Sequence, residues 1–327
     1  MNFQAKMLRR FLPILLLISA AGAHAQAQNY PNKPVKLLIP LAAGSAVDVV
    51  ARIVANKMGE TLGQSFVVEN EPGAAGLLGM RTGARAAPDG YTILATNDSV
   101  ITMLPNMRKD AGYDPFKDFV PITQIVGIQW VLAVNPSLPA KSVKELIALA
   151  KEKPGTIDYA SGGYGSPQHI AGEMFQRAAG IRLTHVPYKG VTPAVTDVVG
   201  GHAPMMFTAL STVAPFMADG RIRILAATSP ERMPQLPDTP TMQEAGVPGF
   251  KFNTWCAMLA PAGTPRPIVD RLNAAAAAAL KDPAIRKRLI ELGYDVIGDT
   301  PEQLGAFMHE EYRRTGDLIR AANIHIE

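Results

Sequence analysis

Short apolar segments alternate with segments of helical spacing along most of the chain, and this alternation limits the fold more than any other feature of the sequence. Residues 35–41 form an apolar-rich run between Pro34 and Gly44, which is typical of a buried strand. Apolar residues in the next segment, 47–62, recur at the spacing of one helix face. Because the same order recurs further along, we expect an α/β protein with mostly parallel sheets flanked by helices.

The rest of the chain follows this pattern up to a helical C-terminal part. We expect further strands at 64–69, 91–95, 158–161, 184–188, 205–208 and 222–228. We expect further helices at 73–87, 143–151, 169–180, 193–199, 213–217, 268–280, 283–292 and 301–322. No repeat of roughly 20 to 50 residues is visible, which excludes solenoids and propellers.

Two stretches are expected to cross between two lobes. One is a predicted strand at 122–135, rich in β-branched residues and ended by Pro136, and the other is 250–261. A chain that leaves the first lobe at one stretch and returns at the other has a two-stranded hinge, which permits closure about a cleft. The predicted division is 1–25 for a signal peptide, 26–124 and 250–327 for the first lobe, and 125–249 for the second.

The first 25 residues have the three parts of a secretory signal peptide. Lys6, Arg9 and Arg10 precede the apolar run 11–21, and a small-x-small cleavage site ends at Ala25. The apolar run is too short to cross a bilayer, which takes roughly 20 residues. We therefore expect export to the periplasm by the Sec route, while the Arg9–Arg10 pair leaves the twin-arginine route open.

Charge and composition exclude several classes of function. Of the net charge of +4, three charges belong to the predicted signal peptide, and the remaining +1 does not favour nucleic acid as a partner. The single cysteine, Cys256, rules out an intramolecular disulfide and lies in an apolar run, which is typical of a buried structural thiol. The histidines lack metal-ligand spacing, and Walker, dinucleotide-binding and nucleophile-elbow motifs are missing, so we expect no metal and no cofactor.

The first candidate for a binding site is the strand-to-helix loop 40–48. Ser45 can cap the following helix, and Asp48 stands three residues later, where it completes a capping-box pattern. The free N–H groups and the positive end of the helix dipole then make an anion site without any Lys or Arg. The alternative is a tight turn that binds nothing. The candidate residues of this loop are Leu41, Ala43, Gly44, Ser45 and Asp48.

A second strand-to-helix loop, 161–169, has the same character. Ser166 stands at an N-cap position, and glycines before it let a ligand approach the backbone. Two helix N-termini that face each other across a cleft suit a ligand with carboxylates. The candidates are Ser161, Gly163, Tyr164, Ser166 and His169, together with Thr96 at another predicted strand end. Because Ser166 stands near His169, a secreted hydrolase of carboxylate esters remains an alternative.

Seven motifs, taken together, resemble the Bug/TctC family of extracytoplasmic solute-binding proteins. They are the segment 35–48, VVENEPG at 67–73, APDGYT at 87–92, YDP at 113–115, VNPSLP at 134–139, HVPYKG at 185–190 and LAPAGTP at 259–265. The resemblance runs from residue 30 to the C-terminus. It implies a two-lobe, type II-like flytrap that closes on a small organic carboxylate without catalysis. It further implies delivery of the ligand, by a monomeric receptor, to the membrane permease subunits of a tripartite tricarboxylate transporter.

The resemblance also implies roles for particular residues. Backbone amides and ordered waters at 41–46 are expected to hold the ligand carboxylate, and loop 161–166 to close on its other end. Many members have an Asp where this chain has Thr208, and that Asp could pair with a ligand ammonium, so we expect a carboxylate without an amino group. Tyr164, often a small or polar residue in relatives, is expected to narrow the ligand space. Presentation of the ligand to a membrane sensor kinase, in place of transport, stays an open alternative.

Overall fold

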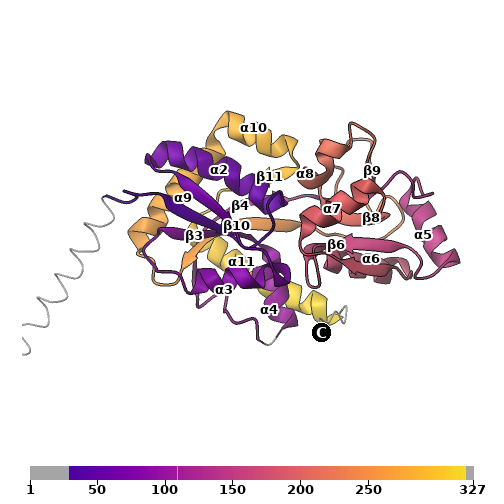
Figure 1. The fold of residues 1–327 in the computed structure, drawn as a ribbon, viewed down its shortest axis with the longest axis horizontal. Helices are drawn as coiled ribbons and strands as arrows, with labels where there is room; N and C mark the ends of the chain where they lie inside the picture. The colour runs from indigo at the N-terminus through magenta and orange to yellow at the C-terminus, as the bar shows by residue number, and fades with distance from the viewer. Residues whose placement is uncertain (1–28, 109, 322–327) are drawn as a thin grey trace, which may run out of the picture.

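The chain folds into two α/β lobes that lie side by side, each built on one sheet (Figure 1). The computed structural model describes residues 29–108 and 110–321. The predicted signal peptide, residues 1–25, lies outside these residues. Within them, no helix is both long enough and apolar enough to cross a membrane.

The first lobe contains a six-stranded sheet in the order β11-β4-β10-β3-β1-β2. Its strands are β1 (Val35–Ile39), β2 (Phe66–Asn70), β3 (Thr92–Asn97), β4 (Phe119–Ile128), β10 (Thr254–Pro261) and β11 (Tyr294–Val296). Strand β1 pairs in parallel with β2 and β3, whereas β10 runs antiparallel to both of its neighbours and β11 runs antiparallel to β4.

Helices cover both faces of this sheet. Successive side chains of a buried strand point to opposite faces, so the apolar residues on each face need a layer of helices to pack against. Leu37 and Ile39 face a core shared with α2 (Ala46–Leu62), α9 (Arg266–Lys281) and α10 (Pro283–Glu291). Leu38 faces the other core. That core is shared with α3 (Leu77–Ala84), the π-helical turn η2 (Ser99–Met103), α4 (Leu104–Met107) and α11 (Pro301–Ala321).

The second lobe contains a five-stranded sheet in the order β7-β6-β8-β5-β9. Its strands are β5 (Trp130–Val134), β6 (Asp158–Ser161), β7 (Thr184–Pro187), β8 (Met205–Ala209) and β9 (Arg223–Ala227). Its helices are α5 (Val143–Glu152), α6 (Pro167–Ala179), α7 (Val191–Gly200), α8 (Leu210–Val213) and the 3-10 turn η3 (Ala214–Phe216). Leu132 faces the core under α5 and α6, and Val131 faces the core under α7.

The predicted α/β class and the two-lobe architecture are confirmed, but the sheets are mixed and not mostly parallel. The reason lies in the strands that cross between the lobes. Strand β4 ends at the cleft and β10 begins there, so the two must run in opposite directions. In the second lobe β5 begins at the cleft, which makes it antiparallel to β8 and β9.

The hinge is built from two crossing segments. The strand predicted at 122–135 is broken at Gln129, where the chain leaves β4 and enters β5. The return path runs into β10, and the Trp130 indole Nε1 donates a hydrogen bond of 2.8 Å to the Thr254 hydroxyl, which joins the two crossings. The lobe boundaries after residues 124 and 249 remain a prediction, and the change of sheet occurs at Gln129 and between β9 and β10.

Two predicted helices differ from the structure. The helix expected at 73–87 begins only at Leu77, because the chain first makes a left-handed turn in which Ala74 has a φ of 47° and Ala75 a φ of 56°. The helix expected at 213–217 is instead α8, which starts at Leu210 and gives way to η3. Pro215 in that turn has no N–H to continue an α-helical ladder.

Candidate functional site

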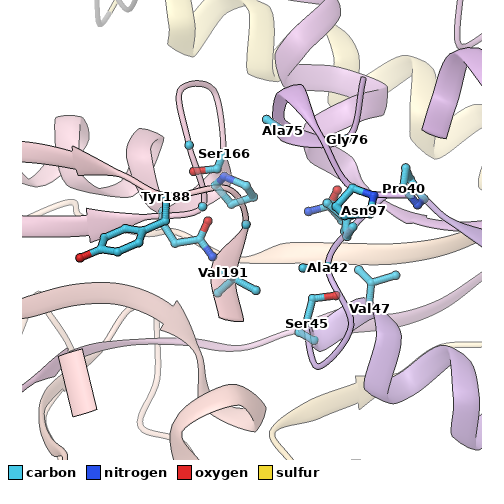
Figure 2. A pocket seen from close by; sticks show the side chains of 18 of the residues that line it. Pro40, Ala42, Ser45, Val47, Ala75, Gly76, Asn97, Ser166, Tyr188 and Val191 are labelled. Carbon is cyan, nitrogen blue, oxygen red and sulfur yellow. The ribbon is translucent and has the colours of Figure 1, made fainter. Parts of the chain in front are cut away.

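A cavity of about 620 Å³ lies between the lobes, at the carboxyl ends of β1, β3, β6 and β8 (Figure 2). In open α/β sheets this edge is where ligands bind. The cavity is lined from both sides, and Figure 2 shows Ser45 and Asn97 on the first lobe opposite Ser166 and Val191 on the second. The predicted site residues that line it are Leu41, Ser45, Gly163, Tyr164, Ser166 and Thr208.

The first loop presents the N-terminus of α2 to the cavity. Ser45 is the N-cap residue, and its hydroxyl accepts a hydrogen bond of 3.3 Å from the Asp48 N–H. Such a cap satisfies one of the free donors of the first helical turn. The remaining N–H groups and the helix dipole give this end of the cavity a positive potential. Ala43 and Gly44 belong to the same loop but do not line the cavity.

Asp48 lies behind the loop and supports it. Its buried carboxylate accepts hydrogen bonds from the Gly44 N–H at 2.9 Å, from Arg52 at 3.0 Å and from the Asn70 amide at 2.9 Å. Burial alone raises the pKa of Asp48, but the hydrogen bonds from Arg52, Gly44 and Asn70 outweigh it and lower the pKa below its usual range. Since Asn70 also bonds the Leu41 carbonyl oxygen at 3.0 Å, one network holds the loop.

The second loop presents the N-terminus of α6. The Ser166 hydroxyl accepts a hydrogen bond of 3.4 Å from the His169 N–H, as an N-cap does. Gly163 has a φ of 116° and stands so close to the Tyr188 carbonyl oxygen that a Cβ would come within 3.2 Å of it. A glycine is therefore required at this turn. Tyr164 projects from it with 59% of its surface exposed.

A cluster of aromatic rings supports this loop from behind. The His169 and His185 rings stack at 4.4 Å, and Tyr164 meets both edge-on. Burial lowers the pKa of His169, and burial together with the neighbouring His169 lowers the pKa of His185 to about 4. Both rings are neutral near pH 7, and His169 does not line the cavity.

The structure does not pair the side chains of Ser166 and His169, as the hydrolase alternative would require. The Ser166 hydroxyl caps the backbone of His169, whereas the hydroxyl of fully buried Ser161 lies 2.6 Å from His185 Nε2. Within the described chain, His185 Nδ1 has no hydrogen-bond partner. A nucleophile needs a base that a third group orients, and Ser161 does not line the cavity, so this pair lacks that arrangement.

The strand end at β3 contributes a different residue from the one predicted. Thr96 is fully buried and does not line the cavity, whereas its neighbour Asn97 does. Alternate residues of a strand face opposite ways, so a shift of one position exchanges the two. On β8, Thr208 lines the cavity, and its hydroxyl lies 2.7 Å from that of Thr212.

A third helix N-terminus at the cavity was not predicted from the sequence. Helix α7 begins after Gly190, which has a φ of 114° and provides no side-chain cap, and Gly190 and Val191 line the cavity. Figure 2 shows the Tyr188 ring turned away from the first lobe, in line with the bond of its hydroxyl to Asp197 at 2.7 Å. The last residues of the HVPYKG motif are the local signal for this helix start.

The charged side chains in the described lining of the cavity are all positive. Arg108 from the first lobe and Lys189 from the second line the cavity, and among its described lining residues there is no Asp or Glu. Arg108 follows α4, and the sequence around it contains no recognisable anion-binding motif. The residues of the described chain include no group of three His, Cys, Asp or Glu side chains able to hold a metal ion.

Two contacts join the lobes beside the cavity. The Thr192 hydroxyl of α7 donates a hydrogen bond of 2.6 Å to the Ala43 carbonyl oxygen of the first loop. The Tyr294 hydroxyl of β11 donates to the Ala46 carbonyl oxygen at 2.7 Å and lies 2.9 Å from the Ser211 hydroxyl of α8. The start of α2 is therefore tied to the second lobe at two points.

Comparison with known proteins shows that this chain is similar to solute-binding receptors. The model of the tripartite tricarboxylate transporter family receptor, TctC, matches residues 50–324. Protein BugT of Bordetella pertussis is 33% identical over 321 residues, covering 96% of this chain and 97% of its own.

Three solved structures share the fold over their whole length. The periplasmic binding protein BugD is 36% identical with a TM-score of 0.87, and the match covers 91% of this chain and 100% of BugD. An R. palustris protein with adipate is 33% identical with a TM-score of 0.88, covering 91% and 99%. MatC from Rhodopseudomonas palustris, with bound malate, is 32% identical with a TM-score of 0.84, covering 89% and 100%.

Proposed function

This chain belongs to the TctC family of tripartite tricarboxylate transporter receptors, and from that premise we propose that it captures a small organic carboxylate in the cavity between its lobes. The resemblance to the Bug/TctC family that its motifs indicated is thereby confirmed. The family consists of periplasmic solute-binding receptors. We propose that this chain, too, acts in the periplasm as a monomeric receptor without catalysis and delivers its ligand to the membrane permease subunits of such a transporter.

The observation that carries the proposal is the lining of the cavity. Three helices, α2, α6 and α7, begin at it, and its described lining includes two cations and no carboxylate. Helix N-termini and cations both stabilise negative charge, whereas a nearby Asp or Glu would repel it. Two structurally similar relatives hold adipate and malate, which supports an organic acid as the ligand class.

Thr208 narrows the ligand class further. Its hydroxyl is paired with Thr212, so this wall offers neutral oxygen atoms and no counter-charge for an ammonium group. An α-amino acid in the cavity would bury its ammonium without a carboxylate partner, which costs more than the hydroxyl contact returns. We therefore propose a carboxylate without an amino group.

A thermal-shift screen of the exported protein, residues 26–327, tests the proposal. The panel contains aliphatic, aromatic and hydroxylated mono- to tricarboxylates, and each acid is paired with its amino-acid analogue where one exists. A ligand at 100 times its Kd adds about 2.7 kcal/mol to the free energy of unfolding, which appears as a shift of several degrees. We expect shifts with carboxylates and none with the amino-acid partners. Shifts with amino acids alone would contradict the proposal. So would a screen in which no compound shifts the unfolding temperature.

A further inference from the structure

Two cationic side chains face the cavity from opposite lobes. Arg108 stands at the C-terminal end of α4 in the first lobe, and Lys189 stands in the turn between β7 and α7 in the second. Both side chains are exposed, and no hydrogen bond or ion pair is seen for either within the described chain. By contrast, Arg52, in the helix that follows the first loop, is bound by Asp48 and Asn70.

These two cations are additional to the anion-binding groups of the helix starts. The N-termini of α2 and α6 are fixed by the Ser45 and Ser166 caps, and α7 begins without a side-chain cap. Those N–H groups suffice for one carboxylate. Arg108 comes from a different part of the chain, at the end of α4, and Lys189 directly precedes Gly190, the N-cap of α7. Their charged side chains are distinct from the helix N–H groups, so they provide for a second negative group on the same ligand.

The two side chains also suit different tasks. The guanidinium of Arg108 presents a planar fork of N–H donors that matches the two oxygens of a carboxylate. Its backbone is held, since the Arg108 N–H bonds the Leu104 carbonyl oxygen at 2.9 Å. Lys189 is a flexible point charge that lines the cavity from the opposite lobe. Arg108 can therefore orient an acid, whereas Lys189 adds charge when the lobes close on it.

The remaining lining and the size of the cavity fit an acid with two charged ends. The apolar side chains Ile128, Trp130 and Val191 line it, and they suit a carbon skeleton. A volume of about 620 Å³ holds a molecule much larger than one carboxylate group. No Asp or Glu of the described lining competes with the ligand for Arg108.

We infer that the ligand carries two acidic groups, and that Arg108, assisted by Lys189, binds the second one and sets the preference for diacids over monoacids. This inference rests on the proposed receptor function and adds the residue that determines specificity.

Matched acid pairs of equal chain length test the inference by isothermal titration calorimetry. The probes are succinate with butyrate, adipate with hexanoate, and phthalate with 2-methylbenzoate. For the pair that binds best we expect the wild-type protein to prefer the diacid by tenfold or more. We expect Arg108→Gln to lose most of that preference while the affinity for the monoacid changes less than twofold. We expect Lys189→Gln to reduce the preference for the diacid about threefold.

Two further variants serve as controls. Arg85→Gln removes an exposed arginine of the first lobe that does not line the cavity, and its diacid preference should equal that of the wild type. Arg108→Lys keeps the charge and should retain a part of the preference, which separates a charge effect from a folding defect. The thermal midpoint of each variant reports on folding.

The outcomes separate this inference from the receptor proposal. Equal affinity for diacid and monoacid, or an Arg108→Gln protein that behaves like Arg85→Gln, would overturn the role of Arg108 and leave the receptor standing. An absence of binding by every acid would overturn the receptor proposal, and this inference with it.

Discussion

The hydroxyl of Thr192 in the second lobe donates a hydrogen bond of 2.6 Å to the carbonyl oxygen of Ala43 in the first. Ala43 belongs to the loop that caps α2, and Thr192 belongs to the first turn of α7, so this bond links two of the three helix starts at the cavity. The loop that we propose to hold the ligand is thereby also linked to the second lobe.

Removing this bond should weaken the link between the two lobes beside the cavity. A hydrogen bond contributes a net ~0.5–1.5 kcal/mol, which means that Thr192→Val should weaken ligand binding by about two- to twelvefold, mainly through faster dissociation. Stopped-flow measurement of the dissociation rate checks this. Thr196→Val is the matched control, because the Thr196 hydroxyl bonds only within α7, to the Thr192 carbonyl oxygen. Equal rates in the two variants would show that the bond between the lobes has no role in closure.

The two serine caps at the cavity should contribute to stability and, through the positions of the helix starts, to binding. Loss of an N-cap costs about 1 kcal/mol, so Ser45→Ala and Ser166→Ala should each lower the unfolding free energy by that amount and weaken binding severalfold. Ser142→Ala provides the control, since Ser142 caps α5 in the same way and does not line the cavity. Urea unfolding and calorimetry report the two effects. Unchanged affinity in both cavity variants would mean that backbone amides alone hold the ligand.

Asp48 should stabilise the protein only above the pH at which its carboxylate forms. Its pKa is lowered in the folded state, so its contribution is present above the unfolded value near 3.9 and is lost as the pH falls through the folded value. We expect Asp48→Asn to cost about 1–3 kcal/mol at pH 7, because a buried charged partner of Arg52 is removed. The difference from wild type should shrink below about pH 4. Urea unfolding at several pH values measures this, and a difference that stays constant with pH would contradict it.

His185 should give the stability a second dependence on pH. Its pKa falls to about 4 on folding, so its neutral form adds stability above the unfolded value near 6.5. That stability declines as the pH drops from about 6.5 towards 4, because the unfolded chain takes up a proton that the folded one does not. His185→Gln keeps a polar group beside Ser161 and cannot titrate, so its unfolding free energy should fall less over this range. Parallel curves for variant and wild type would rule out a role for His185.

Local patterns were sufficient to predict the elements of the site. The capping positions of Ser45 and Ser166 follow from residues within three positions of each other, and both caps are present in the structure. Most of the order of strands and helices was predicted for the same reason, since each element depends mainly on its own periodicity. The short elements β11, η2 and α4 were not predicted.

Features that depend on distant partners could not be predicted. The antiparallel direction of β10 follows from its return across the hinge, and the assignment of Asn97 in place of Thr96 depends on strand register. Neither the bond between Thr192 and Ala43 nor the place of Arg108 at the cavity leaves a signal in the neighbouring sequence. Such contacts form only when segments far apart in the chain meet.

The central claim is that this chain captures a carboxylate between its lobes. It is tested most directly by calorimetric titration of residues 26–327 with the acid that shifts their unfolding most. The account predicts saturable binding of one acid molecule per chain, and no binding of the corresponding amino acid. A titration without saturation for every acid of the panel, or saturation by amino acids only, would contradict it.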